Sequence, residues 1–164
     1  MSVPNVTLEQ HEEQTLYGLW APSNDRTVSK DIPRLSKQYF RAAQQENGTV
    51  FPFFVLSRNY DEQTRGFELF IGSIADHEGL EAFVLPAGTY GKLTVRPKLG
   101  FLWGAAVGQA KTFFYAKWLP SSGYRAANLE YEYHTEKSVE KSPSIDLFFT
   151  IQNKSGPFQP QNTR

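Results

Sequence analysis

The order of the predicted elements is the feature that most constrains this chain, because the order strand, helix, hairpin occurs twice. Periodicity and turn residues predict a first set at these positions: a strand at 16–20, a helix from Asp31 to Asn47-Gly48, and a hairpin of 50–56 and 66–74. A second set follows: extended segments at 80–85 and 89–95, a helix at 100–118, and a hairpin of 129–134 and 145–151. The sequence therefore predicts a fold built from two copies of one unit.

Residue similarity between the two sets supports a duplication. FELFIG at 67–72 aligns with IDLFFT at 145–150, and Tyr60-Asp61-Glu62 aligns with His134-Thr135-Glu136. Two βαββ units predict an α+β fold with a mostly antiparallel sheet, both helices on one face and a central ligand cleft, either between the helices or on the far face of the sheet. Chance similarity of short apolar strands is the alternative.

The second predicted helix has a wide apolar face and ends near Pro120. One apolar line comprises Trp103, Val107, Ala110, Phe114 and Trp118, and a neighbouring line comprises Leu102, Ala106, Ala110 and Phe113. Gly104 and Gly108 each cost about 1 kcal/mol relative to alanine inside a helix. We therefore expect a sheet or a ligand to approach the helix backbone closely at these glycines.

The run Leu129 to His134 alternates with period two, so it predicts a strand with two different faces. Leu129, Tyr131 and Tyr133 would lie on one face, and Glu130, Glu132 and His134 on the other. An amphipathic strand with its glutamates in water is one interpretation. A ligand site at the acidic strand is the other.

The composition excludes several classes of protein. With 17 basic and 17 acidic residues and no cysteine, the chain offers no electrostatic footprint for direct nucleic-acid or membrane binding, no disulfides and no thiol chemistry. Nucleophile-elbow, phosphate-loop and zinc-helix motifs do not occur, and the three histidines are scattered, so neither a metal nor a cofactor is predicted. The N-terminus has no signal-peptide pattern, which predicts a cytoplasmic protein.

The length of 164 residues suits one domain. We expect residues 1–12 to be a polar lead-in, 13–152 to form the domain with pseudo-repeats at about 13–75 and 80–152, and 153–164 to be a disordered tail.

The second half resembles a known family. The residues that carry the resemblance are Leu85-Pro86-Ala87-Gly88-Thr89-Tyr90, a long helix ending in Tyr115-Ala116-Lys117-Trp118-Leu119-Pro120-Ser121-Ser122-Gly123-Tyr124, an acidic strand, and a closing strand ending at Ile151. Over roughly 85–151 the chain resembles the gyrase-inhibitor-like (GyrI-like) family. That family includes the effector-binding domains of bacterial AraC-type and multidrug-responsive transcription regulators.

The resemblance implies a duplicated βαββ domain that binds small organic, often cationic and aromatic, ligands. The family carries a pocket glutamate in the pattern aromatic, Glu, any residue, Tyr. Tyr131-Glu132-Tyr133-His134 matches it with histidine in the last place, and Leu129-Glu130 is a second register. The chain has no room for a preceding helix-turn-helix, so the resemblance implies a stand-alone binding domain, with a homodimer or a protein partner left open.

The 24 aromatic residues are more than an ordinary core of this size needs. We expect Trp103, Trp118, Tyr90 and Phe148 to line a cavity between the two halves, together with Tyr131, Tyr133 and the two glutamates. The alternative is that the aromatic side chains simply fill the core.

Two other functions remain open. A hydrolase of electrophilic small molecules, as reported for some relatives, would use Glu132 as general base and Tyr133 or Tyr90 as acid. A protein-binding module, such as a gyrase inhibitor, would use exposed hairpin loops. No catalytic residue is assigned.

Overall fold

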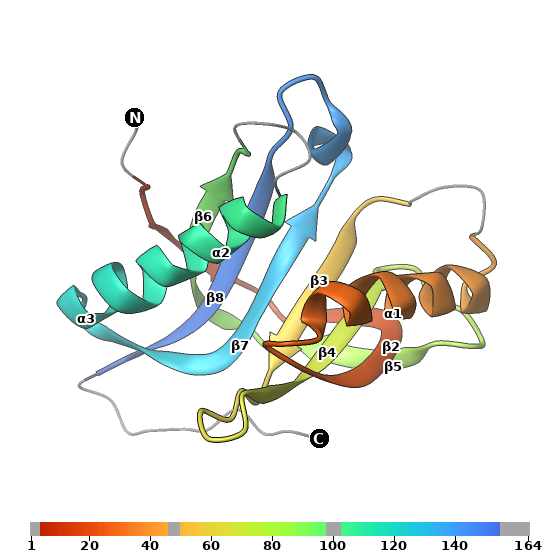
Figure 1. Cartoon of the computed structure of the whole chain (residues 1–164), viewed down its shortest axis with the longest axis horizontal. Helices are drawn as coiled ribbons and strands as arrows, with labels where there is room; N and C mark the ends of the chain where they lie inside the picture. Colours follow the sequence, from red (N-terminus) through yellow and green to blue (C-terminus); the bar gives the residue numbers. More distant parts are fainter. Residues whose placement is uncertain (1–3, 46–49, 98–102, 155–164) are drawn as a thin grey trace.

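Two ββαββ units follow one another along the chain. The computed structural model describes residues 4–45, 50–97 and 103–154. Its elements are β1 (Thr7–His11), β2 (Gln14–Asn24), α1 (Val28–Ala42), β3 (Phe53–Arg58), β4 (Gly66–Ser73), β5 (Glu81–Leu85), β6 (Gly88–Val95), α2 (Trp103–Phe113), the π turn η1 (Phe114–Trp118), α3 (Leu119–Ser121), β7 (Tyr124–His134), the 3-10 turn η2 (Glu136–Val139) and β8 (Ile145–Asn153) (Figure 1).

All eight strands form one sheet in the order β1-β6-β8-β7-β3-β4-β2-β5. Every neighbouring pair is antiparallel, and β3 of the first unit meets β7 of the second at the centre. The prediction of an α+β fold from a duplicated unit is confirmed.

Each unit contributes its first strand to the other unit's part of the sheet. β1 pairs with β6, and β5 pairs with β2. Residues 7–11, which the sequence analysis assigned to a polar lead-in, thus form an edge strand instead. Only Glu12 and Glu13 connect β1 to β2, although these strands lie near opposite edges, so the sheet must curl to bring its edges together.

The inner face of the curl is filled by a cluster of buried side chains that come from strands alone. Its members are Leu16, Phe54, Leu56, Phe70, Phe83, Leu85, Tyr90, Leu129, Tyr131 and Phe148, with Trp20 and Tyr133 packed against them. We call this the inner aromatic core. It is buried because the curled sheet covers it from several sides.

Both helices pack on the outer face of the sheet, as predicted (Figure 1). α1 places Leu35 and Tyr39 on Val55 and Ile71. α2 and η1 pack on a second outer cluster formed by Leu93, Val95, Phe114, Ile145, Leu147, Phe149 and Ile151.

The first helix begins earlier than the sequence analysis predicted. It starts at Val28, because Asn24 Oδ1 accepts the backbone N–H groups of Arg26 and Thr27 just before the first turn. Asp31, predicted as the N-cap, lies inside the first turn. The helix ends at Ala42, and the predicted stop at Asn47-Gly48 lies outside the described residues.

The second helix buries the predicted apolar line, and its last turns are irregular. Trp103, Val107, Ala110, Phe114 and Trp118 all pack on the outer cluster. The predicted start at Gly100 lies outside the described residues. Near its end the helix widens into η1 and finishes at Ser121, one residue after a proline that lacks a donor for the i−4 carbonyl.

The prediction that the sheet approaches Gly104 and Gly108 closely was wrong, and the alternative of a ligand there stays a prediction. A Cβ added at either position would meet no described atom within 4 Å. The tight glycines are in the sheet, where Gly18 lies opposite Gly72 and the Phe70 ring covers both. A Cβ at Gly18 would lie 2.7 Å from the Phe70 ring, so these glycines make room for that ring.

Candidate functional site

The alternation along β7 separates its carboxylates from its tyrosines. Glu132 lies opposite Val55, whose side chain packs under α1, and Tyr131 lies opposite Leu56 of the inner aromatic core. Since cross-strand partners share a face, Glu130, Glu132 and His134 lie on the helical face of the sheet. The two faces predicted from the sequence therefore exist.

A groove of about 340 Å³ lies on the helical face and is lined by residues of both units. From the first unit come Ile32, Ser36, Phe40, Phe51, Phe53 and Val55, and from the second come Glu132, His134, Ser138 and Val139. We call this the interhelical groove, because residues of α1 and of the 3-10 turn η2 line it; no described residue of α2 does. Its volume falls in the range of about 300–1,000 Å³ that is usual for small-molecule sites.

Three phenylalanines and a histidine are among the residues that line the interhelical groove. The rings of Phe40 and Phe53 are stacked with centroids 5.7 Å apart, and the Phe53 ring meets His134 edge-on at 6.0 Å. Phe53 and His134 are direct cross-strand partners, so β3 and β7 hold this contact in register. The groove thus offers ring faces and edges to a flat or apolar ligand.

The polar groups of the groove are a carboxylate and an imidazole. Glu132 Oε1 lies 3.0 Å from His134 Nε2, and the Glu132 side chain is 18% exposed. A carboxylate with so little water around it differs from the solvated glutamate of the simplest amphipathic strand. It presents a partly desolvated negative charge to the groove.

A second carboxylate continues the acidic row along β7. Glu130 is 20% exposed, and its Oε2 atom lies 3.5 Å from Lys111 Nζ of α2. Burial lowers the pKa of Lys111, but the attraction of Glu130 and Glu132 outweighs this effect and raises the pKa overall. Burial, together with the Glu130 carboxylate, raises the pKa of Tyr115 well above its usual value. Both side chains thus keep their protons at neutral pH.

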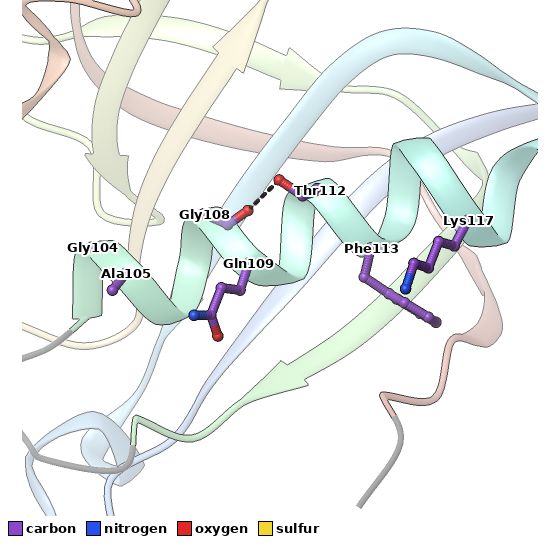
Figure 2. A pocket seen from close by; sticks show the side chains of 7 residues that line it. All are labelled: Gly104, Ala105, Gly108, Gln109, Thr112, Phe113 and Lys117. Atoms are coloured by element: carbon purple, nitrogen blue, oxygen red, sulfur yellow. Dashed lines mark hydrogen bonds between the residues drawn. The ribbon is translucent and has the colours of Figure 1, made fainter.

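A larger hollow, of about 570 Å³, lies along the outside of α2 and η1. Figure 2 shows that all seven of its lining residues come from this one helical segment, with small side chains or none at Gly104, Ala105 and Gly108. A hollow lined by a single helix has no opposite wall and can bury little of a ligand. We therefore assign the site to the interhelical groove.

The structure separates the eight predicted site residues into three groups. Glu132 lines the groove, and Glu130 lies beside it on the same strand face. Tyr90, Tyr131, Tyr133 and Phe148 belong to or pack on the inner aromatic core, on the other side of the sheet. Trp103 and Trp118 pack with the outer cluster under α2. One cavity lined by all four predicted aromatic residues is therefore not formed.

The inner aromatic core behaves as packed interior. The Tyr131 ring stacks on Phe148 at 5.1 Å, and Tyr90 Oη donates a hydrogen bond of 2.6 Å to the carbonyl of Pro86. Burial raises the pKa values of both tyrosines. The predicted hydrolase pairing of Glu132 with Tyr133 or Tyr90 is not brought together, because Glu132 lies on the helical face and both tyrosines lie in or on the inner aromatic core.

Sequence analysis missed the aromatic walls of the groove. Phe40 falls in the predicted helix and Phe53 in a predicted strand, and no local pattern indicates that their rings stack or that the Phe53 ring meets His134. The available signal was weak. The acidic face of 129–134 and the helix at 31–46 belong to different halves, so their contact depends on the pairing of β3 with β7.

The doubled unit, the curled eight-stranded sheet and the two helices on one of its faces make up the fold of this chain. Three solved structures share this fold. An integron cassette protein from Vibrio cholerae superposes with a TM-score of 0.66 at 10% identity, over 90% of this chain and 95% of that one. SAV2435 bound to tetraphenylphosphonium superposes with a TM-score of 0.64 at 11% identity, over 90% of this chain and 94% of that one. The C-terminal domain of EcmrR superposes with a TM-score of 0.60 at 16% identity, over 93% of this chain and 99% of that one.

At these identities the likeness concerns the fold, and it confirms the fold that the resemblance implied. No protein-family model matches the chain, and no curated protein matches it. Among the described residues, no helix has the length and apolarity to cross a membrane, and no three His, Asp or Glu side chains gather as metal ligands.

Proposed function

We propose that this chain is an effector-binding module that takes up a small organic cation with an aromatic or hydrophobic body in the interhelical groove. The observation that carries the proposal is the Glu132 carboxylate, 18% exposed, in a groove walled by Phe40 and Phe53. A partly desolvated carboxylate is costly, and a ligand that brings a positive charge offsets that cost.

The aromatic walls add to the attraction for such a ligand. A cation over a ring face gains about 0.5–2 kcal/mol, depending on how far it is desolvated. The hydrogen bond from His134 orients one oxygen of Glu132. A carboxylate can accept further contacts through its other oxygen, so this pair does not exhaust its capacity.

Tetraphenylphosphonium is a suitable probe, because it is the molecule bound to SAV2435, which has the same fold. The experiment is calorimetric titration of the wild-type chain and of Glu132→Gln with this cation and with neutral triphenylphosphine oxide. Glutamine keeps the shape of the side chain and removes its charge. We expect the substitution to weaken binding of the cation by about tenfold or more, which corresponds to the loss of a charged contact of about 1.5–3 kcal/mol.

The neutral probe and an inner-core variant serve as controls. Binding of triphenylphosphine oxide should change by less than about threefold in Glu132→Gln, and Tyr133→Phe should leave both affinities unchanged. A Glu132→Gln variant that binds both probes as the wild type does would show that the groove is not a cation site.

A further inference from the structure

The ion pair between Lys111 and Glu130 lies next to the carboxylate of the proposed site. We infer that Lys111 selects ligands by their charge: by pairing with Glu130 it leaves Glu132 as the one carboxylate open to a ligand cation, so that the groove accepts one positive charge and discriminates against two. This inference rests on the proposed function and concerns its specificity.

The geometry places two carboxylates within reach of one elongated ligand. Glu130 and Glu132 are alternate residues of β7 on the same face, which separates their backbone positions by about 7 Å along the strand. Lys111 extends from α2 and brings its Nζ to 3.5 Å from Glu130 Oε2. The ammonium group therefore occupies the place that a second ligand charge would take.

With His134 counted as neutral, the formal charges of this region sum to one negative. Glu130 and Glu132 contribute two negative charges, and Lys111 contributes one positive charge. The pKa of Lys111 is raised because both glutamates attract the ammonium more than burial penalises it. Lys111 therefore remains charged and compensates one of the two carboxylates under ordinary conditions.

Lys111 is well suited to act as a counter-ion that can be released. Its side chain is 33% exposed, and a lysine ammonium sits on a flexible stem that can turn to water. A dicationic ligand would have to displace it and give up the Lys111–Glu130 attraction. A monocationic ligand at Glu132 would leave that pair in place.

The test compares a monocation with a dication of the same body on the full chain. Benzyltrimethylammonium and para-xylylene-bis(trimethylammonium) are titrated at fixed ionic strength into the wild type, Lys111→Met, and the double variant Lys111→Met/Glu130→Gln. Lys111→Met should raise the affinity for the dication by about tenfold and the affinity for the monocation by less than about threefold. The double variant restores the wild-type charge sum, so it should restore the wild-type preference.

The outcomes separate this inference from the proposed function. If Lys111→Met tightens both probes equally, or neither, the inference is wrong, and the proposed function stands as long as monocation binding needs Glu132. If no variant binds either probe, the proposed function is wrong and the inference is overturned with it. Thermal unfolding checks that each variant is folded, and Lys111→Gln gives the same comparison if the methionine variant is unstable.

Discussion

The Phe114 ring lies flat on the Phe149 ring, with centroids 3.9 Å apart and planes 9° apart. Phe114 belongs to η1 and is fully buried, and Phe149 comes from β8. This contact holds the irregular end of the second helix on the sheet. It also fixes the position of Tyr115, whose neighbour Glu130 borders the groove.

Replacing Phe114 by alanine should lower the free energy of unfolding by about 3–5 kcal/mol, because it removes a buried ring and leaves a cavity. Urea denaturation measures the change. Val139→Ala is the matched control, since Val139 is 73% exposed and its loss should cost less than about 0.5 kcal/mol. Equal effects of the two substitutions would contradict the anchoring role of Phe114.

The glycines of the sheet and of α2 should respond to alanine in opposite directions. Gly108→Ala should stabilise the protein by about 1 kcal/mol, because the added methyl group meets open space and alanine favours helix. Gly18→Ala should destabilise it, because the new Cβ would lie 2.7 Å from both the Phe70 ring and Gly72 Cα. Thermal unfolding of both variants measures the two changes in stability. Unchanged ligand binding in Gly108→Ala would also show that the hollow outside α2 is not the site.

Asp31 should make the fold sensitive to acid. Hydrogen bonds from the Thr27 and Ser23 hydroxyls, with help from Arg34, lower the pKa of Asp31 below its ordinary value of 3.8. A carboxyl group with a lowered folded-state pKa stabilises the fold above the unfolded-state pKa, and this contribution is lost as pH falls through the folded-state value. The stability of Asp31→Asn should therefore fall less than that of the wild type between pH 5 and pH 2. Parallel pH curves of urea unfolding would rule out this contribution.

Tyr90→Phe should separate stability from ligand binding. The substitution removes the hydrogen bond to the carbonyl of Pro86 and should cost about 1 kcal/mol of unfolding free energy. Because Tyr90 belongs to the inner aromatic core, the affinity for tetraphenylphosphonium should not change. A large loss of affinity at unchanged stability would move the ligand site to the inner face.

Periodicity in the sequence predicted the elements of this fold better than it predicted the site. The alternation of 129–134 correctly assigned Glu132 and Tyr131 to opposite faces. It could not show which face the helices cover, because the alternation within one strand carries no information on where the helices pack. That choice depends on the curl of the sheet, which follows from long-range pairings such as Thr7 with Lys92.

The sequence also failed to predict a short, polar strand. Residues 7–11 read TLEQH, with one large apolar side chain, so no hydrophobic pattern indicated an edge strand. Backbone hydrogen bonds to β6 hold residues 7–11 in a strand, although few of their side chains are buried. Similarly, the exposed face of α2 carries Gly104 and Gly108, where helix propensity alone suggested a close contact that the structure does not contain.

The exchange of first strands makes the two units resemble the partners of an intertwined dimer joined into one chain. A cut between β4 and β5 would separate β2 from its outer neighbour β5, and β6 from its outer neighbour β1. Neither fragment could complete its own share of the sheet. The duplication therefore produced two copies that depend on each other to fold, and the pairing of β1 with β6 has to wait until distant parts of the chain have met.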